Sequence, residues 1–573
     1  MNSLQILKRG MLAILLYILI GSSLFASVAL VTSDQVNSYV IQDYVFSVTG
    51  STKDFALRSV VLPSGGDPAF ETEEAMIEAL AAKKQLLINK RIFTEVEFDY
   101  TLDSYSRGTA YYIATFYVKD ASTFLTIPYP KFDNDTVGLR LGVKMYDKNL
   151  FGTFGDLYIS GTVSQGDGGR SGWENREDIL EMVLSSLPIG KTYLDIAFDY
   201  ERTKGSSDAG KLNFSFDWNN IKVKGAKLSI APWGKFNPSS DFSSWNPVEY
   251  GVAWKISQFK QYDSSFSLYN QIKRYTKEEE LTYLKNLYTL TYLDQHDLTF
   301  FTHPISFRIS SESDAVLGSG ALSYMNVGTT LGTGISLPFG LTWSTSVGSF
   351  LHYTPGETPV PYSFLFSNTI SKSNINWKGN FRKGISFSLD YITDIYPQEE
   401  YWNSKNTWYV ASSASWFPFV TKHLNPSIQF RGFIAGEKKR DHFSNETIAD
   451  AMRGYLTNTI EDLDMDLGLG IEREYGAIIN MNLTTSFINF GFAKSYASPF
   501  IDIGIFHDGA NPDKPIIISS AGLDGWAILN KFPSYPIRGS LGFNLQDVRE
   551  AIDNEIGFTE IEWELFIGMG LFF

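Results

Sequence analysis

The sequence predicts a mostly β protein, a transmembrane antiparallel β-barrel of about 16 strands preceded by one small α+β domain. Two observations lead to this prediction. From about residue 121 to residue 573, stretch after stretch alternates apolar and polar residues with a period of two, as a β-strand with two unlike faces does. The 573 residues also include 15% aromatic residues and 47 glycines, a composition typical of large antiparallel sheets with aromatic belts.

The carboxyl-terminal stretch WELFIGMGLFF (563–573) illustrates the alternation. One face would carry Trp563, Leu565, Ile567, Met569, Leu571 and Phe573, and the other Glu564, Phe566, Gly568, Gly570 and Phe572. A soluble sheet also alternates, but its polar face rarely repeats glycine, tyrosine and carboxylates in every strand. A closed barrel requires alternation in each strand and leaves no unpaired edge in lipid. A large soluble β domain remains the alternative.

Composition and motifs argue against several other functions. The net charge of −15 disfavours nucleic-acid binding, and the absence of cysteine removes disulfides, thiol nucleophiles and Cys metal sites. The six histidines show no metal-binding spacing, and the stretch GKT (190–192) lacks the first glycine of a phosphate loop. No nucleophile elbow is present. We therefore predict no enzyme activity, no cofactor and no metal, although an enzyme inside the lumen stays open.

The amino terminus is typical of a secretory signal peptide over residues 1–29. Lys8 and Arg9 precede an apolar run at 11–20, and small residues follow at 21–29. Cleavage is expected after Ala26 or Ala29. A membrane anchor is the alternative, although the apolar core is short.

Residues 30–120 are predicted to form a separate β-α-β-β domain. The segment 39–50 has the pattern of a strand, and 71–90 that of a helix that Thr72 can cap. The segments 91–102 and 109–118 would form a hairpin. Residues 121–573 would then be the barrel.

Three stretches resemble the superfamily that contains BamA, TamA and the two-partner secretion translocators. IPYPKFDNDTVGLRLGVKMYDKNLFGTFGD (127–156) resembles the early barrel of that superfamily. The resemblance implies that KNLFGTFG is a periplasmic turn, in which Gly152 and Gly155 would supply the turn geometry.

The second and third stretches are AMRGYLTN and PFIDIGIF. Arg453, Gly454 and Tyr455 resemble the Arg-Gly-aromatic motif of the superfamily's sixth extracellular loop, which folds back into the barrel. PFIDIGIF (499–506) resembles the Phe-x-Asp-x-Gly strand, which would place Asp502 in the lumen as a partner for Arg453. FRGF (430–433) competes for the loop motif, although Arg431 fits a lumen wall in an alternating strand. Asp502 could also be an ordinary solvated carboxylate.

Residues 30–120 then resemble a POTRA domain, although BamA-type proteins usually carry five such modules, TamA three and the secretion translocators two. The resemblance implies an outer-membrane protein of a diderm bacterium, with the POTRA-like domain in the periplasm. It would assist insertion, assembly or translocation of unfolded outer-membrane or secreted polypeptide clients. Accessory periplasmic proteins are possible partners, besides outer-membrane lipid.

The last strand would form a seam with the first strand, and its carboxyl terminus resembles a barrel assembly signal. Gly568 and Gly570 suit a weak seam, because glycine disfavours strand order, or they relieve crowding in the lumen. Phe573 would complete the carboxyl-terminal signal. The alternative functions are a secretion translocator dedicated to one partner and a passive outer-membrane channel.

Overall fold

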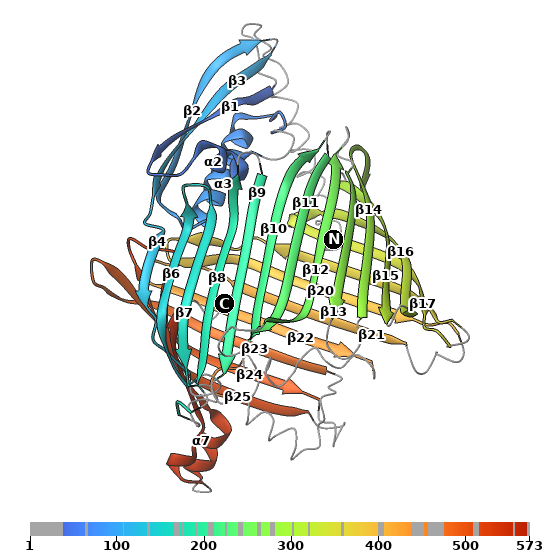
Figure 1. Ribbon diagram of the computed structural model, residues 1–573. Coiled ribbons are helices and arrows are strands. Elements are labelled where there is room, and N and C mark those ends of the chain that lie inside the picture. The colour runs from blue at the N-terminus through green and yellow to red at the C-terminus, as the bar shows by residue number, and fades with distance from the viewer. Residues whose placement is uncertain are drawn as a thin grey trace, which may run out of the picture. The chain divides into compact units, whose positions relative to one another are not determined.

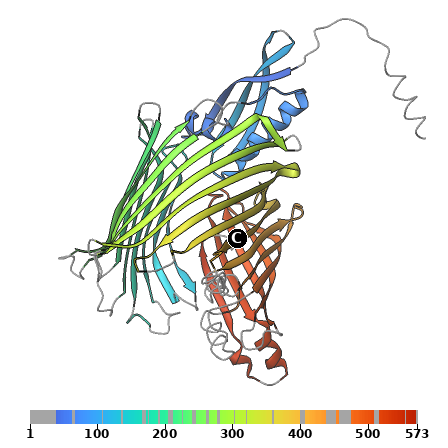
Figure 2. The same cartoon turned by 90° about the vertical axis from the view of Figure 1, so that its right-hand side faces the viewer.

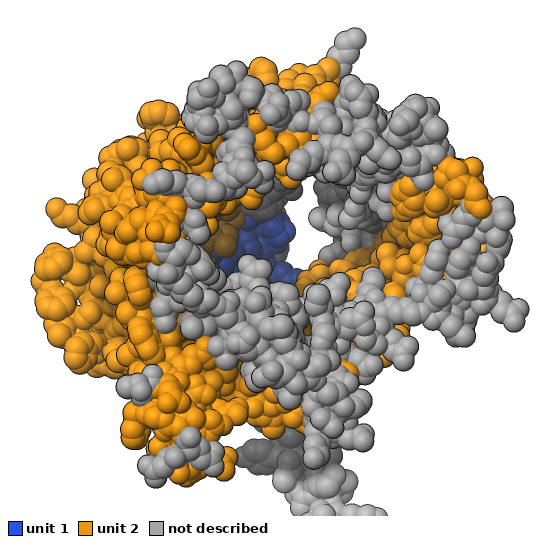
Figure 3. Space-filling model, turned by 60° about the horizontal axis from the view of Figure 1, so that its bottom comes forward, with its two compact units in different colours: residues 1–45, 62–82, 98–116 blue, residues 46–61, 83–97, 117–573 orange. Residues whose placement is uncertain are grey.

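A computed structural model describes most of residues 38–569. It leaves out 63–66, 107, 134–137, 166–171, 175, 190–191, 204–210, 224–225, 239–244, 260–264, 276–280, 301–302, 319–320, 357–359, 399–405, 437–451, 456–474, 508–514 and 554–555. The predicted signal peptide (1–29), Gly570 and Phe573 lie outside the described residues. The chain forms two compact units, one of residues 1–45, 62–82 and 98–116 and one of residues 46–61, 83–97 and 117–573 (Figure 3). They are called unit 1 and unit 2.

The described residues between Ser38 and Asp120 form a three-stranded sheet and two helices. The elements are β1 (Ser38–Thr49), α2 (Asp54–Val61), α3 (Glu73–Asn89), β2 (Phe93–Ser106) and β3 (Thr109–Asp120), and the strand order is β1-β3-β2. The predicted strand, helix and hairpin are therefore present, and α2 is an additional helix. Thr72 Oγ1 accepts a hydrogen bond from Ala75 N (3.1 Å) at the start of α3. Met76, Leu80 and Leu87, which lie on one side of α3, are fully buried.

The remaining strands belong to one large antiparallel sheet with 22 strands (Figure 1). They are β4 (Phe124–Pro128), β5 (Lys131–Asp133), β6 (Gly138–Leu150), β7 (Gly155–Ser164), β8 (Glu177–Ile189), β9 (Thr192–Thr203), β10 (Lys211–Val223), β11 (Ala226–Pro238), β12 (Trp245–Phe259), β13 (Ser265–Tyr275), β14 (Leu281–Phe300), β15 (His303–Gly318), β16 (Ala321–Leu337), β17 (Leu341–Tyr353), β18 (Tyr362–Ser373), β19 (Asn376–Lys378), β20 (Phe381–Ile395), β21 (Thr407–Phe417), β22 (Leu424–Ala435), β23 (Tyr475–Asn489), β24 (Ala493–Phe506), β25 (Ile516–Leu529), β26 (Pro536–Asn544) and β27 (Trp563–Met569).

The prediction of about 16 strands is wrong. Two pairs of labels each mark one interrupted strand, because β4 and β5 both pair with β6, and β18 and β19 both pair with β20. The prediction assumed too many residues per strand and connection. Several connections are short, as in the turn Pro338–Gly340 (η2) between β16 and β17.

Each strand of the large sheet pairs with the strands before and after it in the sequence. The last strand also pairs with a strand at the beginning of the sheet. The last strand, β27, pairs with β5 through Phe566↔Asp133 and Ile567↔Phe132. Figures 1 and 2 show the strands of unit 2 curving round, and Figure 3 shows this unit hollowed. The described part of the chain contains one further α-helix, α7 (Leu545–Ile552), and the short turn η3 (Phe558–Glu560), both between β26 and β27.

The two faces of the sheet differ in burial. In β24, Asp502 is fully buried, whereas its neighbour Ile501 is 45% exposed. We call the face of Asp502 the inner face and that of Ile501 the outer face. Leu483, Leu523 and Ile537 are further exposed apolar residues on β23, β25 and β26. In the part of the chain that is described, no helix has the length and apolarity needed to span a membrane.

The turn between β6 and β7 contains Gly152, one of the two glycines predicted to shape it. Gly152 has φ +76°, and an added Cβ there would lie 1.9 Å from Ser51 O, so both its conformation and its packing require glycine. Lys53 N donates to Gly152 O (2.8 Å). Gly155 instead begins β7 and needs no left-handed backbone, because Phe154 before it takes the positive φ of 61°.

Candidate functional site

Four described residues between β22 and β23, Met452–Tyr455, lie against the inner face of the large sheet. Met452 and Tyr455 belong to a buried cluster with side chains of the wall, namely Phe433, Ala435, Ile478, Phe506 and Ile518. Arg453 is only 2% exposed. The buried apolar neighbours Met452 and Tyr455 thus keep the charged guanidinium of Arg453 away from water. Polar partners must offset the free-energy cost of this desolvation.

Asp502 on β24 is the main partner of Arg453. Arg453 Nε donates to Asp502 Oδ2 (2.9 Å), and Arg453 Nη2 donates to Asp502 Oδ1 (2.6 Å). The backbone N of Arg453 also donates to Asp502 Oδ2 (3.1 Å). Two parallel bonds between a guanidinium and a carboxylate fix both distance and orientation, so the aspartate holds the loop in one position.

The remaining donors of Arg453 are bonded to β23 and β25. Arg453 Nη1 donates to Asn482 Oδ1 (2.8 Å) and to Asp524 Oδ2 (2.7 Å). Asp524 Oδ1 in turn accepts from Arg538 Nη2 on β26 (2.9 Å). The result is a buried group of two arginines and two aspartates whose charges balance.

The aromatic ring of Phe500 stacks against the guanidinium of Arg453 in this charged group. Its ring centroid lies 3.5 Å from Cζ of Arg453, a distance at which the ring face attracts the cation. The gain of a buried ion pair offsets its desolvation only while every partner is present. We therefore expect the group to act as one unit rather than as separate pairs.

Gly454 brings the backbone of the loop into contact with the last two strands. Its φ is +92°, and an added Cβ would lie 2.7 Å from Phe543 N and 2.9 Å from Gly542 C. Gly542 is its counterpart on β26, since a Cβ there would lie 2.7 Å from Gly454 N. Gly454 N donates to Glu564 Oε2 on β27 (2.7 Å). The loop is therefore tied directly to the last strand.

Tyr455 connects the loop to the segment beyond β26. Its hydroxyl lies 2.9 Å from Asn544 Oδ1 and 3.2 Å from Ser519 O, and it accepts from Ser519 N (3.2 Å). Asn544 Oδ1 also accepts from Gln546 N and so caps α7. Residues 453–455 thus contact all five strands from β23 to β27.

The hydrogen bond from Gly454 N to Glu564 allows the contribution of the last strand to the stability of the protein to be tested. A charged acceptor bonds more strongly than a neutral one, so Glu564→Gln is expected to lower the free energy of unfolding by about 1 kcal/mol. A urea titration of the purified protein measures this change. Glu560→Gln, at an exposed position in η3, is the matched control and should change it by less than about 0.5 kcal/mol. Equal effects of the two substitutions would contradict the assigned role of Glu564.

Arg431, the competing candidate for the loop motif, is not part of the loop. It is an exposed residue of β22, opposite Ser413 and Ile478 in the two neighbouring strands. Several participants in the site were not predicted from the sequence, namely Asn482, Phe500, Asp524, Arg538, Gly542, Asn544 and Glu564. Asp524 and Arg538 are isolated charges in strands that otherwise alternate apolar and small residues, and this signal could have identified them.

Beside the seam between β27 and β5, an aromatic ring occupies the space next to Gly568. An added Cβ at Gly568 would lie 2.7 Å from Cζ of Phe566 and 3.4 Å from the hydroxyl of Tyr129. This packing agrees with relief of crowding, one of the two roles considered for this glycine. Among the described residues, the seam has two residue pairs, whereas β26 and β27 share seven.

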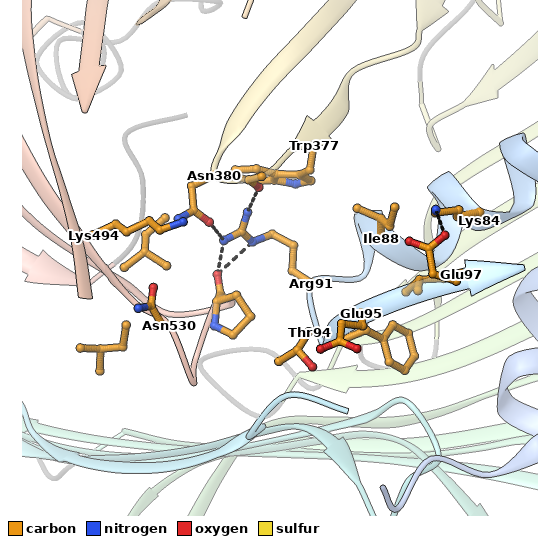
Figure 4. A pocket seen from close by; sticks show the side chains of 16 residues that line it. Lys84, Ile88, Arg91, Thr94, Glu95, Glu97, Trp377, Asn380, Lys494 and Asn530 are labelled. Atoms are coloured by element: carbon orange, nitrogen blue, oxygen red, sulfur yellow. Dashed lines mark hydrogen bonds and ion pairs between the residues drawn. The ribbon is translucent and has the colours of Figure 1, made fainter. Parts of the chain in front are cut away.

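A second group of contacts lies where the α3–β2 turn meets the turns of the large sheet, within unit 2 (Figure 4). The guanidinium of Arg91 stacks on Trp377, with Cζ 3.9 Å from the ring centroid. Arg91 Nε donates to Pro533 O (2.9 Å), and Nη2 donates to Asn380 Oδ1 (3.1 Å). Burial lowers the pKa of Arg91 to about 10, so the group is still charged at neutral pH. A cavity of about 500 Å³ lies beside these residues.

Arg91→Ala is expected to loosen the α3–β2 turn from the sheet and to lower the free energy of unfolding by about 1–2 kcal/mol. Hydrogen exchange of the amides at 90–94 reports the local opening. Arg58→Ala is the control, because Arg58 pairs with Asp54 on an exposed helical turn, where such pairs contribute little. If the amides exchange equally fast in both variants, Arg91 does not fasten this turn.

No group of three or more His, Cys, Asp or Glu side chains that could hold a metal ion occurs within the described parts of the chain. The sequence matches no family model and no curated protein. Solved structures do match over most of its length. One match is BamA from Haemophilus ducreyi lacking POTRA domains 1–3. The alignment covers 93% of this chain and 84% of the BamA chain, with 10% identity and a TM-score of 0.29.

Two further matches are CdiB and an iron transporter. CdiB from Acinetobacter baumannii has 10% identity, covers 93% of this chain and 74% of its own, and has a TM-score of 0.30. The FrpB iron transporter from Neisseria meningitidis has 8% identity, covers 80% of this chain and 84% of its own, and has a TM-score of 0.46. These identities and TM-scores are too low to assign the chain to a family.

Proposed function

We propose that this chain is an outer-membrane protein that assists the insertion, assembly or translocation of other polypeptides. The observation that carries the proposal is the buried bidentate pair of Arg453 and Asp502, which holds a loop against the inner face of the last five strands. This attachment would hold the closing strands together in a wall that opens at one place.

The large sheet would be a closed transmembrane barrel formed by residues 121–573. Its outer face exposes apolar side chains such as Ile501, Leu523 and Ile537, which lipid would cover. The pairing of β27 with β5 removes the sheet edges that a bilayer cannot satisfy. With the signal peptide predicted at 1–29, the barrel would lie in the outer membrane of a diderm bacterium.

Residues 30–120 would be a single periplasmic POTRA domain. In the sheet order β1-β3-β2, strand β2 pairs with β3 and lies at an edge. An edge strand offers backbone donors and acceptors to an extended segment of a client, which binds as an added strand. The unfolded polypeptide would thereby be brought to the barrel in an extended form, with or without accessory periplasmic proteins.

The seam between β27 and β5 would be the exit to the membrane. Once its pairing with β5 opened, the exposed edge of β27 would template an incoming hairpin. Gly568 and Gly570 would keep the last strand weakly ordered, with Phe573 at the end of the assembly signal. The bond between Glu564 and Gly454 keeps β27 attached to the loop while its pairing with β5 is lost.

Depletion of the protein, followed by quantification of folded barrels in the outer membrane, tests this function. We expect a broad fall in unrelated barrel proteins. Loss of one secreted partner alone would instead indicate a dedicated translocator. An unchanged proteome, with solute conductance that survives removal of residues 30–120, would contradict the proposal and indicate a channel.

A further inference from the structure

The tip of the hairpin formed by β23 and β24 is apolar and exposed. It comprises residues 487–492, with the sequence FINFGF. Phe487 and Phe492 are 71% and 70% exposed, and Ile488 and Phe490 are 44% and 55% exposed. Single exposed apolar residues are ordinary on a protein surface, but a contiguous group of large ones indicates an interaction site.

The tip extends beyond the neighbouring strand β22. Ser486 N donates to His423 O (2.8 Å) just before the tip, in the connection that precedes β22. The register of β23 with β24 shifts between Ser486 and Asn489, as at a β-bulge. A bulge bends a strand pair, so the tip is able to leave the plane of the wall.

Both faces of the tip carry exposed apolar side chains. Successive residues of a strand point to opposite faces, so Phe487 and Ile488 lie on different faces. Phe487 continues the row of Leu483 on the outer face of β23. At the turn, the rings of Phe490 and Phe492 stack with their centroids 6.1 Å apart. A protein surface would cover one face of this hairpin, whereas a lipid leaflet surrounds both.

Hydrogen bonds within the hairpin satisfy backbone groups of the tip, which entry into lipid requires. Ser495 Oγ accepts from Ile488 N (3.1 Å) and donates to Ile488 O (3.0 Å). Phe490 N donates to Ala493 O (2.9 Å) and closes the turn. These groups therefore need no water as a partner.

Asn530, in the connection between β25 and β26, binds the turn from the side. Its Nδ2 donates to Gly491 O (2.6 Å), and its backbone N donates to Phe492 O (2.8 Å). Gly491 N donates to Asn489 Oδ1 (3.1 Å). Because these polar groups are already paired, removing the tip from water costs less free energy.

The charges beside the tip are positive. The segments 415–430, 484–500 and 525–535, which include three successive connections at this end of the sheet, contain no aspartate or glutamate. Their lysines are all exposed, namely Lys422, Lys494 and Lys531. An apolar tip flanked by lysines matches a phospholipid leaflet, in which phosphates lie next to the acyl chains.

Two carboxylates, those of Glu95 and Glu97, line the same cavity as Lys494 (Figure 4). Glu95 Oε1 accepts from Lys119 Nζ (3.0 Å), and Glu97 Oε2 accepts from Lys84 Nζ (2.5 Å). Each carboxylate is thus paired with a lysine of its own. They do not offset the charge of the three lysines beside the tip.

We infer that the tip at 487–492 inserts into the adjacent phospholipid leaflet, with its phenylalanines among the acyl chains and the three lysines at the phosphates. The inference rests on the membrane location proposed above but not on the handling of polypeptides. Through Asn530, the leaflet would also hold the connection between β25 and β26, in which Pro533 O accepts from Arg91 Nε.

Nitroxide labels at single cysteines test the inference, because the chain has no cysteine of its own. The full-length protein is labelled at Ile488→Cys and reconstituted into vesicles of phosphatidylethanolamine and phosphatidylglycerol. Collisions of the label with O2, which concentrates in lipid, are compared with collisions with the polar chelate Ni-EDDA, which stays in water. Labels at Leu523→Cys on the outer face and at Ser104→Cys on β2 are the references for lipid and for water.

We expect the ratio of O2 to Ni-EDDA collisions at position 488 to be at least about fivefold higher than at position 104 and close to that at position 523. Phe487→Ser, Phe490→Ser and Phe492→Ser together should withdraw the tip from lipid and lower the ratio at position 488 to that at position 104. Phe339→Ser is the control, because it removes another exposed phenylalanine from a turn and should leave the ratio unchanged.

A ratio typical of lipid at position 523 but of water at position 488 overturns the inference and leaves the membrane location intact. Ratios typical of water at both positions overturn the membrane location and the inference together. Protection of position 488 from both reagents also overturns the inference, because it indicates a protein contact such as a second copy of the chain. An unchanged ratio in the triple variant has the same consequence, since the phenylalanines would then not hold the tip in lipid.

Discussion

Replacing Arg453 by alanine is expected to lower the free energy of unfolding by roughly 3–5 kcal/mol, because it leaves Asp502 and Asp524 buried without their shared cation. The substitution also removes the stacking on Phe500. A urea titration followed by tryptophan fluorescence measures the change. The loop at 452–455 should at the same time become accessible to protease.

The matched control is Arg431→Ala. Arg431 is exposed, so its loss should change the free energy of unfolding by less than about 0.5 kcal/mol. A double-mutant cycle with Asp502→Asn separates the direct pair from general damage, since the two substitutions should be strongly non-additive. Additive effects, or equal effects of Arg453→Ala and Arg431→Ala, would contradict the role given to Arg453.

Replacing Gly454 by alanine is expected to expel the loop from the wall. The new Cβ would lie 2.7 Å from Phe543 N, 2.9 Å from Gly542 C and 3.0 Å from Phe543 C, all of them backbone atoms that cannot rotate away. The positive φ of 92° adds a further cost of about 1–3 kcal/mol. Trypsin, which cleaves after arginine, should then cut at Arg453, which is buried in the unaltered protein.

Gly491→Ala distinguishes the close contact from the backbone conformation. Gly491 has a similar φ of +78°, but an added Cβ meets no atom within 4 Å. It therefore carries the conformational cost alone, and Arg453 should stay protected in this variant. If trypsin cuts at Arg453 equally in both variants, the contact of Gly454 with β26 does not hold the loop.

The alternation of residues was sufficient to predict the large antiparallel sheet. Strand faces follow from a local period of two, so Ile501 and Asp502 could be assigned to opposite faces without a structure. The number of strands could not be predicted in the same way, because it depends on the length of each connection. The helix α7 was also missed, although Asn544 before it is a favourable N-cap.

Register explains why the loop site was only partly predicted. Arg453 and Asp502 were paired through a resemblance between short motifs. Asp524, Arg538 and Glu564 lie beside them because the pairing register of strands β23 to β27 brings these positions together. No local sequence pattern encodes that register.

The most direct test of the account is to lock the seam. The chain has no cysteine, so Phe132→Cys with Ile567→Cys places one defined pair at directly opposed positions of β5 and β27. Opposed residues of antiparallel strands lie at a distance that a disulfide can bridge. Leu541→Cys with Leu565→Cys, opposed in β26 and β27, is the control lock that leaves the seam free.

Assembly of barrel clients is measured in cells that contain only the locked variant. We expect assembly to stop when the seam disulfide is oxidised, to resume on reduction, and to continue with the control lock. Normal client assembly with a fully oxidised seam would contradict the account, because the exit between β27 and β5 would then be unnecessary.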